Sequence, residues 1–397
     1  MTNVLHCPYC NSKNIRSFLD VKSLSYDCGC VTEAELKKIR EVDLIVSLCL
    51  NCGLGFNSNP PSAEDRLFLY ETFSPVIAQQ ANYVRKPLYD GIFSLLTRYL
   101  NKEDKIVEIG CSDGYLLQLL RDAGYRNCIG IEPGPHCKEA ISKGLNVINS
   151  YFEADTFIGR DVDAFYLLHV FEHFPDPFSI LKSMKMQLMP TGKIIIEVPY
   201  FCHFIPQHLY YYNVLFFTNL TTNLNLKIVE LQIAESKFLI GSVLRIVLTH
   251  ATEKNIEYPF SESPEVLASF ALKQGKMYSM RYQDLRDFIT HAGNNDLYWW
   301  GAGGVSAPAL YAVSHELFNC NSVNVIDSSP MKWGLWMPGT VFQVQPITSI
   351  AGKKIKHLVI ASDYYLEILE TIKSADIEAE NIFVVTISDE FAITQDR

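Results

Sequence analysis

The stretch Ile106-Val-Glu-Ile-Gly-Cys-Ser-Asp-Gly-Tyr-Leu-Leu117 decides how the centre of the chain folds. Its apolar start, with Val107 and Ile109, predicts a buried strand, and the two glycines that follow let the backbone turn sharply and approach a ligand closely. The apolar residues from Tyr115 to Leu120 predict the start of a helix. Glu108 lies within the strand, where an unpaired carboxylate would be costly. A strand, a glycine turn and a helix in this order suggest a cofactor loop.

The composition narrows the class of protein around this loop. A length of 397 residues predicts two or three domains, and a hydrophobic fraction of 48% is ample for buried cores. A formal net charge of −10 argues against nucleic acid or an anionic membrane as the main partner, although it permits an anionic small substrate. The start of the chain does not read as a signal peptide, and no apolar run has the length of a membrane helix. We therefore expect a cytoplasmic protein, as a monomer or small homo-oligomer.

Two cysteine pairs near the start of the chain predict a metal site. The chain has 11 cysteines, an odd number, and nothing that points to export, so metal binding is favoured over a disulfide framework. Cys7-Pro-Tyr-Cys10 and Cys49-Leu-Asn-Cys52 each place two thiolates at the spacing of a zinc knuckle. We expect a structural zinc in a lobe of residues 1–80. Cys28 and Cys30 are alternative ligands, and reduced cysteines in a small core are the other interpretation.

From about residue 81 the chain alternates strands and helices. The apolar helices Tyr115–Ala123 and Pro177–Leu188 lie between several of the strands. Such a pattern indicates an α/β fold with a parallel sheet covered on both faces, whose ligands lie beyond the carboxyl ends of the strands. We expect this domain to occupy residues 81–262. Its expected strands are Lys105–Ile109, Asn127–Ile131, Asn146–Asn149, Val162–His169 and Gly192–Val198.

Polar residues stand at the ends of these expected strands. Glu132 ends the second strand about 20 residues past the glycine loop, where it could accept hydrogen bonds from both hydroxyls of a ribose or simply be solvated. His169-Val-Phe-Glu-His173-Phe-Pro-Asp-Pro177 follows the fourth strand, and Glu197-Val-Pro-Tyr200 follows the fifth. We expect these segments to meet at one edge of the sheet.

The order Glu-x-Gly-x-x-x-Gly, together with these four strand ends, resembles the class I S-adenosylmethionine-dependent methyltransferases. It differs from the dinucleotide pattern, whose glycines have another spacing. The resemblance implies that S-adenosylmethionine is the cofactor. The residues that it places around the cofactor are Glu108, Gly110, Cys111, Gly114, Glu132, Pro133 and His169.

A narrower resemblance follows from two further segments. Ile205-Pro-Gln-His208-Leu-Tyr-Tyr211 and Gly241-Ser-Val-Leu-Arg245 are similar to the Tyr-His-Glu-His-x-x-Tyr and Gly-Ser-x-x-Arg segments of the sugar carbon-methyltransferase family. Members of that family have a four-cysteine zinc lobe in front and a Rossmann-like domain behind. The resemblance implies methylation of carbon 3 of a nucleotide-linked 4-keto-deoxysugar, with zinc bound by Cys7, Cys10, Cys49 and Cys52.

Carried over by position, the resemblance assigns roles to individual residues. His208 falls on the family's proposed general base, Tyr211 on its tyrosine, and His173 on a histidine near the reacting sugar. Tyr70 and Arg245 are expected to contact substrate; Arg245 could pair with a diphosphate or with an acidic neighbour. The chain departs from the family at three positions, because Ile205, Pro206 and Gln207 replace Tyr, His and Glu. A glutamine cannot ionise, so any acid–base role of that glutamate is lost.

Residues 263–397 are expected to form the C-terminal domain, a long helix over Pro264–Ala292 followed by a second Rossmann-like unit. Gly301-Ala-Gly303-Gly304-Val-Ser306 lacks the last glycine of the dinucleotide fingerprint, although Asp327 stands where a ribose-binding acid would, so NAD binding remains a minor alternative. The family resemblance implies a domain that helps to enclose the nucleotide sugar; a domain that only packs is the alternative. The four tryptophans, at 299, 300, 333 and 336, are expected to share a core or to form a wall for a ring.

The leading hypothesis is carbon methylation of a nucleotide-linked keto-deoxysugar by an enzyme of surface-polysaccharide or natural-product biosynthesis. A second hypothesis keeps the cofactor and changes the acceptor to a hydroxyl or amine of a sugar or other small molecule. A third is a zinc-bearing scaffold without activity.

Overall fold

The computed structural model describes residues 5–26, 29–37, 40–72, 82–235, 242–251, 263–362, 364–375 and 377–385. The chain divides into two compact units. Unit 1 comprises Met1–Phe18, Ile45–Pro60 and Ala81–Leu272, and unit 2 comprises Leu19–Leu44, Pro61–Gln80 and Lys273–Arg397. The segment expected to be an N-terminal lobe, residues 1–80, is thus shared between the units. No described helix combines the length and apolar character that crossing a membrane requires.

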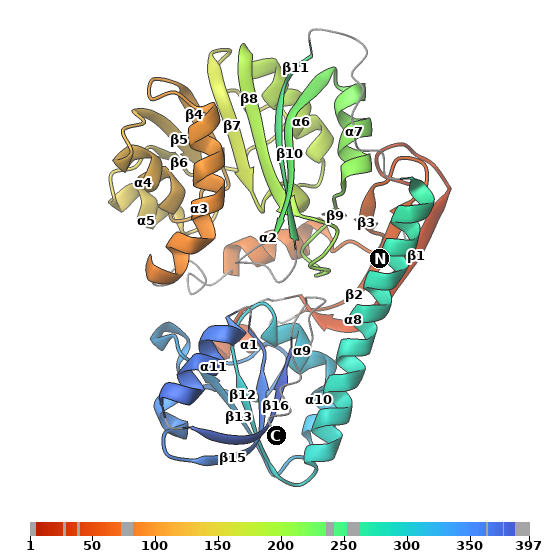
Figure 1. Cartoon of the computed structure of the whole chain (residues 1–397), viewed down its shortest axis with the longest axis vertical. Coiled ribbons are helices and arrows are strands. Elements are labelled where there is room, and N and C mark those ends of the chain that lie inside the picture. Colours follow the sequence, from red (N-terminus) through yellow and green to blue (C-terminus); the bar gives the residue numbers. More distant parts are fainter. Residues whose placement is uncertain are drawn as a thin grey trace. The chain divides into compact units, whose positions relative to one another are not determined.

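Unit 1 is built on a seven-stranded sheet with the strand order β10-β11-β8-β7-β4-β5-β6 (Figure 1). The chain order of the first five strands reverses between β4 and β7, which is where ligands of open α/β sheets bind. Strands β8, β7, β4, β5 and β6 are parallel, and β11 runs antiparallel to both of its neighbours. The strands are β4 (Lys105–Ile109), β5 (Asn127–Ile131), β6 (Val147–Ile148), β7 (Val162–Leu168), β8 (Leu188–Pro199), β10 (Leu226–Glu235) and β11 (Ser242–His250).

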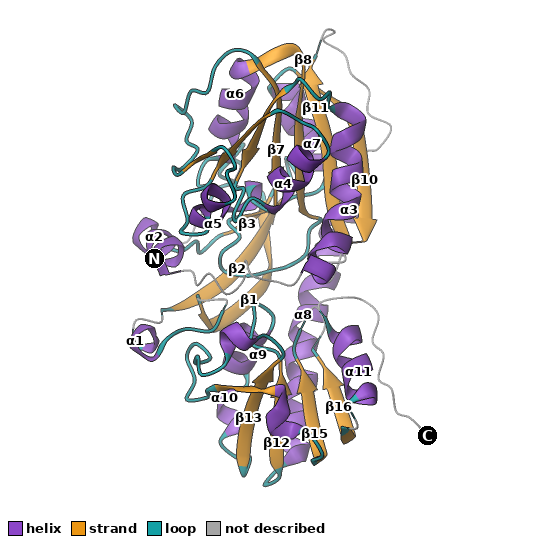
Figure 2. Cartoon of the chain, turned by 90° about the vertical axis from the view of Figure 1, so that its left-hand side faces the viewer, coloured by secondary structure: helices purple, strands orange, loops and turns teal. Residues whose placement is uncertain are grey.

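Helices cover both faces of this sheet (Figures 1 and 2). Alternate residues of β4 show why: Ile106 packs against α3 and α4, whereas Val107 and Ile109 join the core that contains α6 and α7. The two-sided covering accounts for the continuously apolar strands of the sequence. The helices of unit 1 are α3 (Asn82–Tyr99), α4 (Tyr115–Asp122), α5 (Cys137–Ser142), α6 (Pro177–Gln187) and α7 (Val214–Asn223).

The sheet confirms most of the expected strands and adds an antiparallel pair, β10 and β11, that the sequence analysis did not identify. The fifth expected strand is longer at its start: β8 begins at Leu188, which pairs with Val162, and the register then shifts before Ala164 pairs with Lys193. This irregularity absorbs Pro190 and Gly192, residues that weaken a regular ladder. The helix expected to reach Leu188 therefore ends at Gln187.

A small sheet with the order β1-β2-β3-β9 contains the segments around the four cysteines. Its strands β1 and β2 each have residues in both units, and β3 pairs with β9 antiparallel. The elements here are β1 (Ile15–Ser25), β2 (Glu41–Cys49), β3 (Gly55–Asn57) and β9 (Tyr210–Tyr211), and the short helices of unit 2 before residue 80 are α1 (Glu33–Leu36) and α2 (Ala63–Thr72).

Unit 2 has a parallel five-stranded sheet with the order β14-β13-β12-β15-β16 (Figure 2). Helices α8 and α9 pack on one face and α11 on the other, which is the Rossmann-like arrangement that the sequence predicts. The elements are α8 (Pro264–Ala292), β12 (Asp296–Trp300), α9 (Ser306–Ala312), α10 (Ser314–Leu317), β13 (Ser322–Asp327), η3 (Pro330–Lys332), β14 (Val344–Pro346), η4 (Ile347–Ile350), β15 (Lys354–Ile360), α11 (Tyr365–Ser374) and β16 (Glu378–Val384).

The tryptophans of β12 do not share one core. Trp299 is buried with α8 and α9, whereas Trp300 is buried on the α11 face, because successive strand residues point to opposite faces. Ser306, which replaces the last glycine of the dinucleotide pattern, accepts a hydrogen bond from Trp299 Nε1 at 2.7 Å and donates to Gly301 O at 2.7 Å. The serine therefore braces the glycine loop of unit 2.

Candidate active site and metal centre

The glycine loop after β4 has the sharp backbone turns that its sequence predicts. Gly110 and Gly114 both have φ of 75°, in the left-handed region. A Cβ on Gly110 would lie 2.4 Å from Val170 Cγ2, and one on Gly114 would lie 2.5 Å from Leu145 Cδ1. Only glycine fits at these positions, so the loop packs closely against the segment that follows β7.

Glu132 connects the first two strand ends. Its side chain is buried, and its two carboxylate oxygens accept hydrogen bonds from Ser112 N at 2.9 Å and Gly134 N at 2.7 Å. Each oxygen has a second lone pair, so the carboxylate can still accept the hydroxyls of a ribose. Asn149 holds the backbone below it by donating to Glu132 O at 2.8 Å. The acid is thus oriented and not a freely solvated strand end.

Glu108 finds a partner within the sheet. Its Oε2 accepts a hydrogen bond from the Tyr166 hydroxyl at 2.7 Å, across the neighbouring strand β7. Burial raises the pKa of Glu108 to about 8, and the nearby carboxylates of Asp113 and Glu132 add to this. The Tyr166 hydrogen bond lowers the pKa but does not offset burial. The folded protein therefore favours the protonated acid.

This shift predicts a pH dependence of stability. Below pH 4.5 the folded and unfolded states both hold the proton, whereas between pH 4.5 and about 8 only the folded state holds it. Since folding then takes up a proton, the contribution of Glu108 to the free energy of unfolding should fall as pH rises through this window. Urea denaturation of the native chain and of Glu108→Gln at pH 6 and pH 8 measures it. A larger loss of stability in the native chain is expected; equal losses would contradict it.

The side chain of His169 links the ends of β7 and β8. Its φ is 53°, and its Nε2 lies 3.1 Å from Glu197 Oε1. Arg245 Nε donates to the other oxygen of Glu197. Of the two partners expected for this arginine, a diphosphate or an acidic neighbour, the structure shows the acidic neighbour. Burial raises the pKa of Glu197, but the hydrogen bond from His169 and the charges of His169 and Arg245 hold it below its ordinary value.

A second group of side chains gathers just beyond His169. Glu172 and His173 lie in the short helix η2 (Phe171–His173), and His208 follows the segment after β8. The Nε2 of His208 is 3.9 Å from Glu172 Oε1, and the His173 and His208 rings have centroids 4.8 Å apart. The ring of His203 is 5.3 Å from that of His208, and Tyr211 is 6.1 Å from it. The three expected catalytic residues thus lie together.

Burial controls the electrostatics of this group. It raises the pKa of Glu172 to about 7 and lowers the pKa of His173 and of His203 to about 4 each. It also lowers the pKa of His208 well below the ordinary value, with His173 and His203 as further causes. The imidazoles are therefore neutral near neutral pH, each with one lone pair available.

The side chains of Tyr211 and His173 are both directed at backbone carbonyls. The Tyr211 hydroxyl donates to Ile205 O at 3.1 Å, and His173 Nδ1 lies 3.1 Å from Gln207 O. Sequence reasoning named neither Glu172 nor His203 as a functional residue. Glu172 could have been recognised, because it is the residue before His173 in the motif His169–Pro177. His203 could not, because only the folded chain brings it close to the group.

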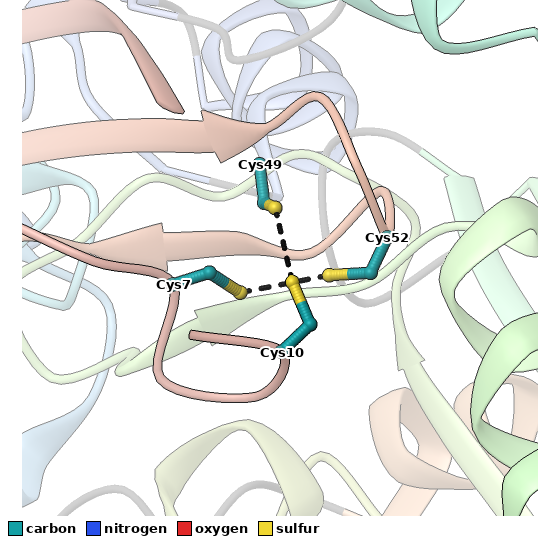
Figure 3. Close-up of side chains that lie close together, drawn as sticks. All are labelled: Cys7, Cys10, Cys49 and Cys52. Atoms are coloured by element: carbon teal, nitrogen blue, oxygen red, sulfur yellow. Dashed lines mark hydrogen bonds between the residues drawn. The ribbon is translucent and has the colours of Figure 1, made fainter. Parts of the chain in front are cut away.

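The four expected metal ligands form a compact cluster in unit 1 (Figure 3). The Sγ atoms of Cys7 and Cys52 are 3.5 Å apart, and those of Cys10 and Cys49 are 3.6 Å apart. A tetrahedral zinc with Zn–S bonds of about 2.3 Å would place its sulfurs roughly 3.8 Å apart. The cluster therefore fits zinc with only a small adjustment.

The two cysteine pairs have matching backbone turns. Asn11 N donates to Cys7 O and Gly53 N donates to Cys49 O, each at 2.9 Å. Asn11 and Gly53 both have positive φ, as the residue after such a turn requires. Asn219 donates to Cys52 O at 3.1 Å, which ties the cluster to α7.

Several residues singled out in the sequence lie outside these two sites or outside the described part of the chain. Cys30 Sγ donates to Ala302 O at 3.0 Å in unit 2, and Cys28 and Gly241 lie outside the described residues. The side chain of Tyr70 also lies outside the described part of the chain. The side chain of Cys111 packs in a small apolar core with Leu117, Ala140 and Leu145. Its contribution to the glycine loop is therefore made by its backbone. Pro133 follows Glu132, and its carbonyl accepts from Asn149 at 3.2 Å.

Asp327 in unit 2 has three hydrogen-bond partners within the chain. Its oxygens accept from Ala302 N at 2.9 Å and Ser329 N at 2.8 Å, and Lys332 Nζ lies 2.9 Å from Oδ2. The carboxylate holds the second glycine loop in place and is neutralised by a lysine. This arrangement gives Asp327 a structural role, which does not require a bound ribose.

Comparisons with known proteins agree with the geometry of unit 1. The family model described as "Methyltransferase domain" matches residues 81–231. The chain is similar to the tRNA U34 carboxymethyltransferases of Aliarcobacter butzleri, with 30% identity over 118 residues, and of Sulfurimonas denitrificans, with 27% identity over 120 residues. These matches span 26% and 27% of this chain and only 37% and 39% of the two relatives.

Among solved structures, the chain is similar to the magnesium protoporphyrin IX methyltransferase of Synechocystis, with 14% identity and a TM-score of 0.38. That match covers 47% of this chain and 95% of the other. The match to the family model alone identifies residues 81–231 as a methyltransferase domain.

Proposed function

We propose that the chain is an S-adenosylmethionine-dependent enzyme that methylates carbon 3 of a nucleotide-linked 4-keto-deoxysugar. The observation that carries the proposal is the largely buried group of Glu172, His173, His208 and Tyr211, which follows the Val170 contact with Gly110 in a methyltransferase domain. Carbon methylation needs an acid–base group next to the cofactor, because the carbon must lose a proton before it can attack.

The cofactor half of the proposal rests on the loop after β4 and on Glu132. Gly110 holds the loop close to Val170 after β7, at the point where the strand order reverses, and Gly114 holds it close to Ala140 and Leu145. The carboxylate of Glu132, oriented by Ser112 N and Gly134 N, is proposed to accept the ribose hydroxyls of S-adenosylmethionine. When bound, this cofactor supplies a methyl group on a sulfonium, which a carbon nucleophile can attack.

The acceptor half rests on His208. A neutral imidazole with a lone pair can take the proton from carbon 3, and the electron pair of that C–H bond moves to the adjacent ketone as an enolate. Carbon 3 then forms the new bond to the methyl group, and the sulfonium leaves as a neutral thioether. His173 and Tyr211 would line the sugar. In their present hydrogen bonds they orient the segment of residues 205–208 and do not donate to substrate.

Glu132→Gln tests the cofactor site. The glutamine amide has only one acceptor oxygen, and its nitrogen is a donor. It therefore cannot accept from Ser112 N and Gly134 N and also from two ribose hydroxyls. We expect S-adenosylmethionine affinity to fall by about 10- to 100-fold, the value of hydrogen bonds to a charged group, as measured by calorimetry. Glu139→Gln, at an exposed carboxylate of α5, is the control with unchanged affinity. Native affinity in Glu132→Gln would contradict the ribose role.

The four-cysteine cluster is proposed to hold a structural zinc. A closed set of four thiolates leaves no position for substrate, so the metal would stabilise the fold. Unit 2 is proposed to contribute to nucleotide-sugar binding.

An RNA acceptor is the second candidate, because the relatives matched over part of the chain are named as tRNA-modifying enzymes. The net charge of −10 disfavours it, since RNA binding relies on cationic surfaces. Oxygen or nitrogen methylation of a small molecule is a third candidate. Incubation with labelled S-adenosylmethionine and, separately, nucleotide-linked keto-sugars, the same sugars without the ketone, and tRNA distinguishes them. Label only in keto-sugars supports the proposal, and label in tRNA alone would overturn it.

A further inference from the structure

We propose that Glu172, His173 and His208 form a second metal site, with nitrogen and oxygen ligands, for a divalent transition-metal ion such as Zn²⁺ or Co²⁺. The site goes beyond the proposed function and is separate from the four-cysteine cluster.

The spacing of the three side chains fits ligands of one ion. One candidate ligand atom from each side chain lies within 4.8 Å of the other two. Within this set, His208 Nε2 and Glu172 Oε1 are 3.9 Å apart. This distance is too long for a hydrogen bond, yet two ligands about 2.0–2.2 Å from a shared ion lie at most about 4.4 Å apart. A small inward movement of the third ligand completes the set.

The burial of these groups calls for a ligand. Glu172 is 1% exposed, and within the described part of the chain neither of its carboxylate oxygens has a hydrogen-bond partner. His208, whose Nε2 faces this carboxylate, is only 5% exposed. A buried carboxylate without hydrogen bonds is costly, and coordination to a cation is one of the few arrangements that offset the cost.

One ligand already has the outer contact that metal-bound histidines usually make. His173 Nδ1 lies 3.1 Å from Gln207 O, so an N–H there leaves the lone pair on Nε2. The backbone also fixes the short helix that holds Glu172 and His173: His173 N donates to Val170 O at 3.0 Å, and Leu209 N donates to Glu172 O at 2.9 Å. The second of these bonds joins the His208 segment to the helix.

The donor set indicates the class of ion. Two imidazoles and one carboxylate suit zinc, cobalt or iron, whereas calcium and magnesium prefer oxygen ligands alone. Three protein ligands leave a position open, unlike the closed set of four cysteines. His173 is only partly buried, so the group has an approach from its side.

An ion at this site would affect the proposed chemistry. A metal bound through Nε2 of His208 takes the lone pair that the proposed base needs. We therefore expect a second equivalent of Zn²⁺ to inhibit methyl transfer reversibly.

Metal titration of the full chain tests the site. The protein is stripped with a chelator and titrated with Co²⁺, whose sulfur charge-transfer absorption reports the cysteine cluster and whose weaker d–d bands report a nitrogen and oxygen site. The native chain should bind two equivalents with these two signatures. Glu172→Gln keeps the shape of the side chain but removes a ligand. Loss of an outer-shell contact typically lowers metal affinity by about 10- to 100-fold, so loss of the ligand itself should weaken binding of the second equivalent by more than this. Glu153→Gln, at an exposed carboxylate, is the matched control.

Cofactor binding by calorimetry checks that Glu172→Gln is folded. If it is not, the stoichiometry and spectrum of the native chain decide alone. A single equivalent with only the sulfur signature would overturn the site, as would a second equivalent unchanged in folded Glu172→Gln. Neither result bears on the methyl-transfer assay, which is run on native protein that holds one or two equivalents of zinc. If the second equivalent of Zn²⁺ increased methyl transfer, the metal site would be supported, but the assignment of His208 as the base would be wrong.

Discussion

Replacing His208 with alanine is expected to lower methyl transfer by about 10²- to 10⁴-fold, the usual contribution of a positioned base. The proposal gives this residue the proton of carbon 3, and no other described histidine of the group has the same position next to both Glu172 and Tyr211. The affinity for S-adenosylmethionine should stay near that of the native chain, because the cofactor site is proposed to rest on Gly110, Gly114 and Glu132, in the loops after β4 and β5. Single-turnover rates and calorimetry measure the two quantities.

His250→Ala is the matched control for that variant. This histidine ends β11, which runs antiparallel to β8, and its Nε2 lies 3.3 Å from Leu188 O at the start of β8. It therefore stands at the edge of the sheet away from the carboxyl ends of the parallel strands, and its loss should leave transfer unchanged. Substantial transfer by a folded His208→Ala would rule out the base assignment.

Replacing Cys49 with serine is expected to cost both zinc and folding yield. Structural zinc sites contribute apparent free energies of about 10–16 kcal/mol, so the loss of one of four thiolates should lower the denaturation midpoint strongly. Cys49 is buried, and its turn joins β2 to the core of the methyltransferase domain. Zinc content by atomic emission and urea denaturation measure the effect.

Cys320→Ser is the control, at a cysteine of unit 2 outside the four-cysteine cluster. It should retain the zinc content of the native chain. If Cys49→Ser also retained zinc and an unchanged midpoint, the metal assignment would be wrong. If Cys49→Ser yields no protein, removal of zinc from the native chain by a chelator gives the same comparison.

The features that sequence predicted best are those that depend on local spacing. Gly110 and Gly114 require positive φ within one loop, and each cysteine pair forms one turn, so a few neighbouring residues determine them. The strands around them also follow from local apolar runs. The ligand edge of the sheet could then be inferred, because parallel strands place their carboxyl ends together.

The features that sequence missed depend on contacts between distant segments. The hydroxyl of Tyr166 meets Glu108 only because β7 lies beside β4, and Glu172 gains its significance only when residues 203–211 fold over it. Trp299 and Trp300 are adjacent in sequence, yet the alternation of a strand sends them to different cores. The strand β11 has an apolar, β-branched sequence, but its antiparallel place in the sheet is set by pairing with the distant β8.

The position of the transferred methyl group is the most direct test of the central claim. Native protein that holds one equivalent of zinc is incubated with S-adenosylmethionine carrying a ¹³C-methyl group and a nucleotide-linked 4-keto-deoxysugar, and the product is examined by NMR. The account predicts a methyl carbon bonded to carbon 3 of the sugar and no transfer to the matching sugar that lacks the ketone. A methyl group on oxygen or nitrogen, or equal turnover without the ketone, would contradict it.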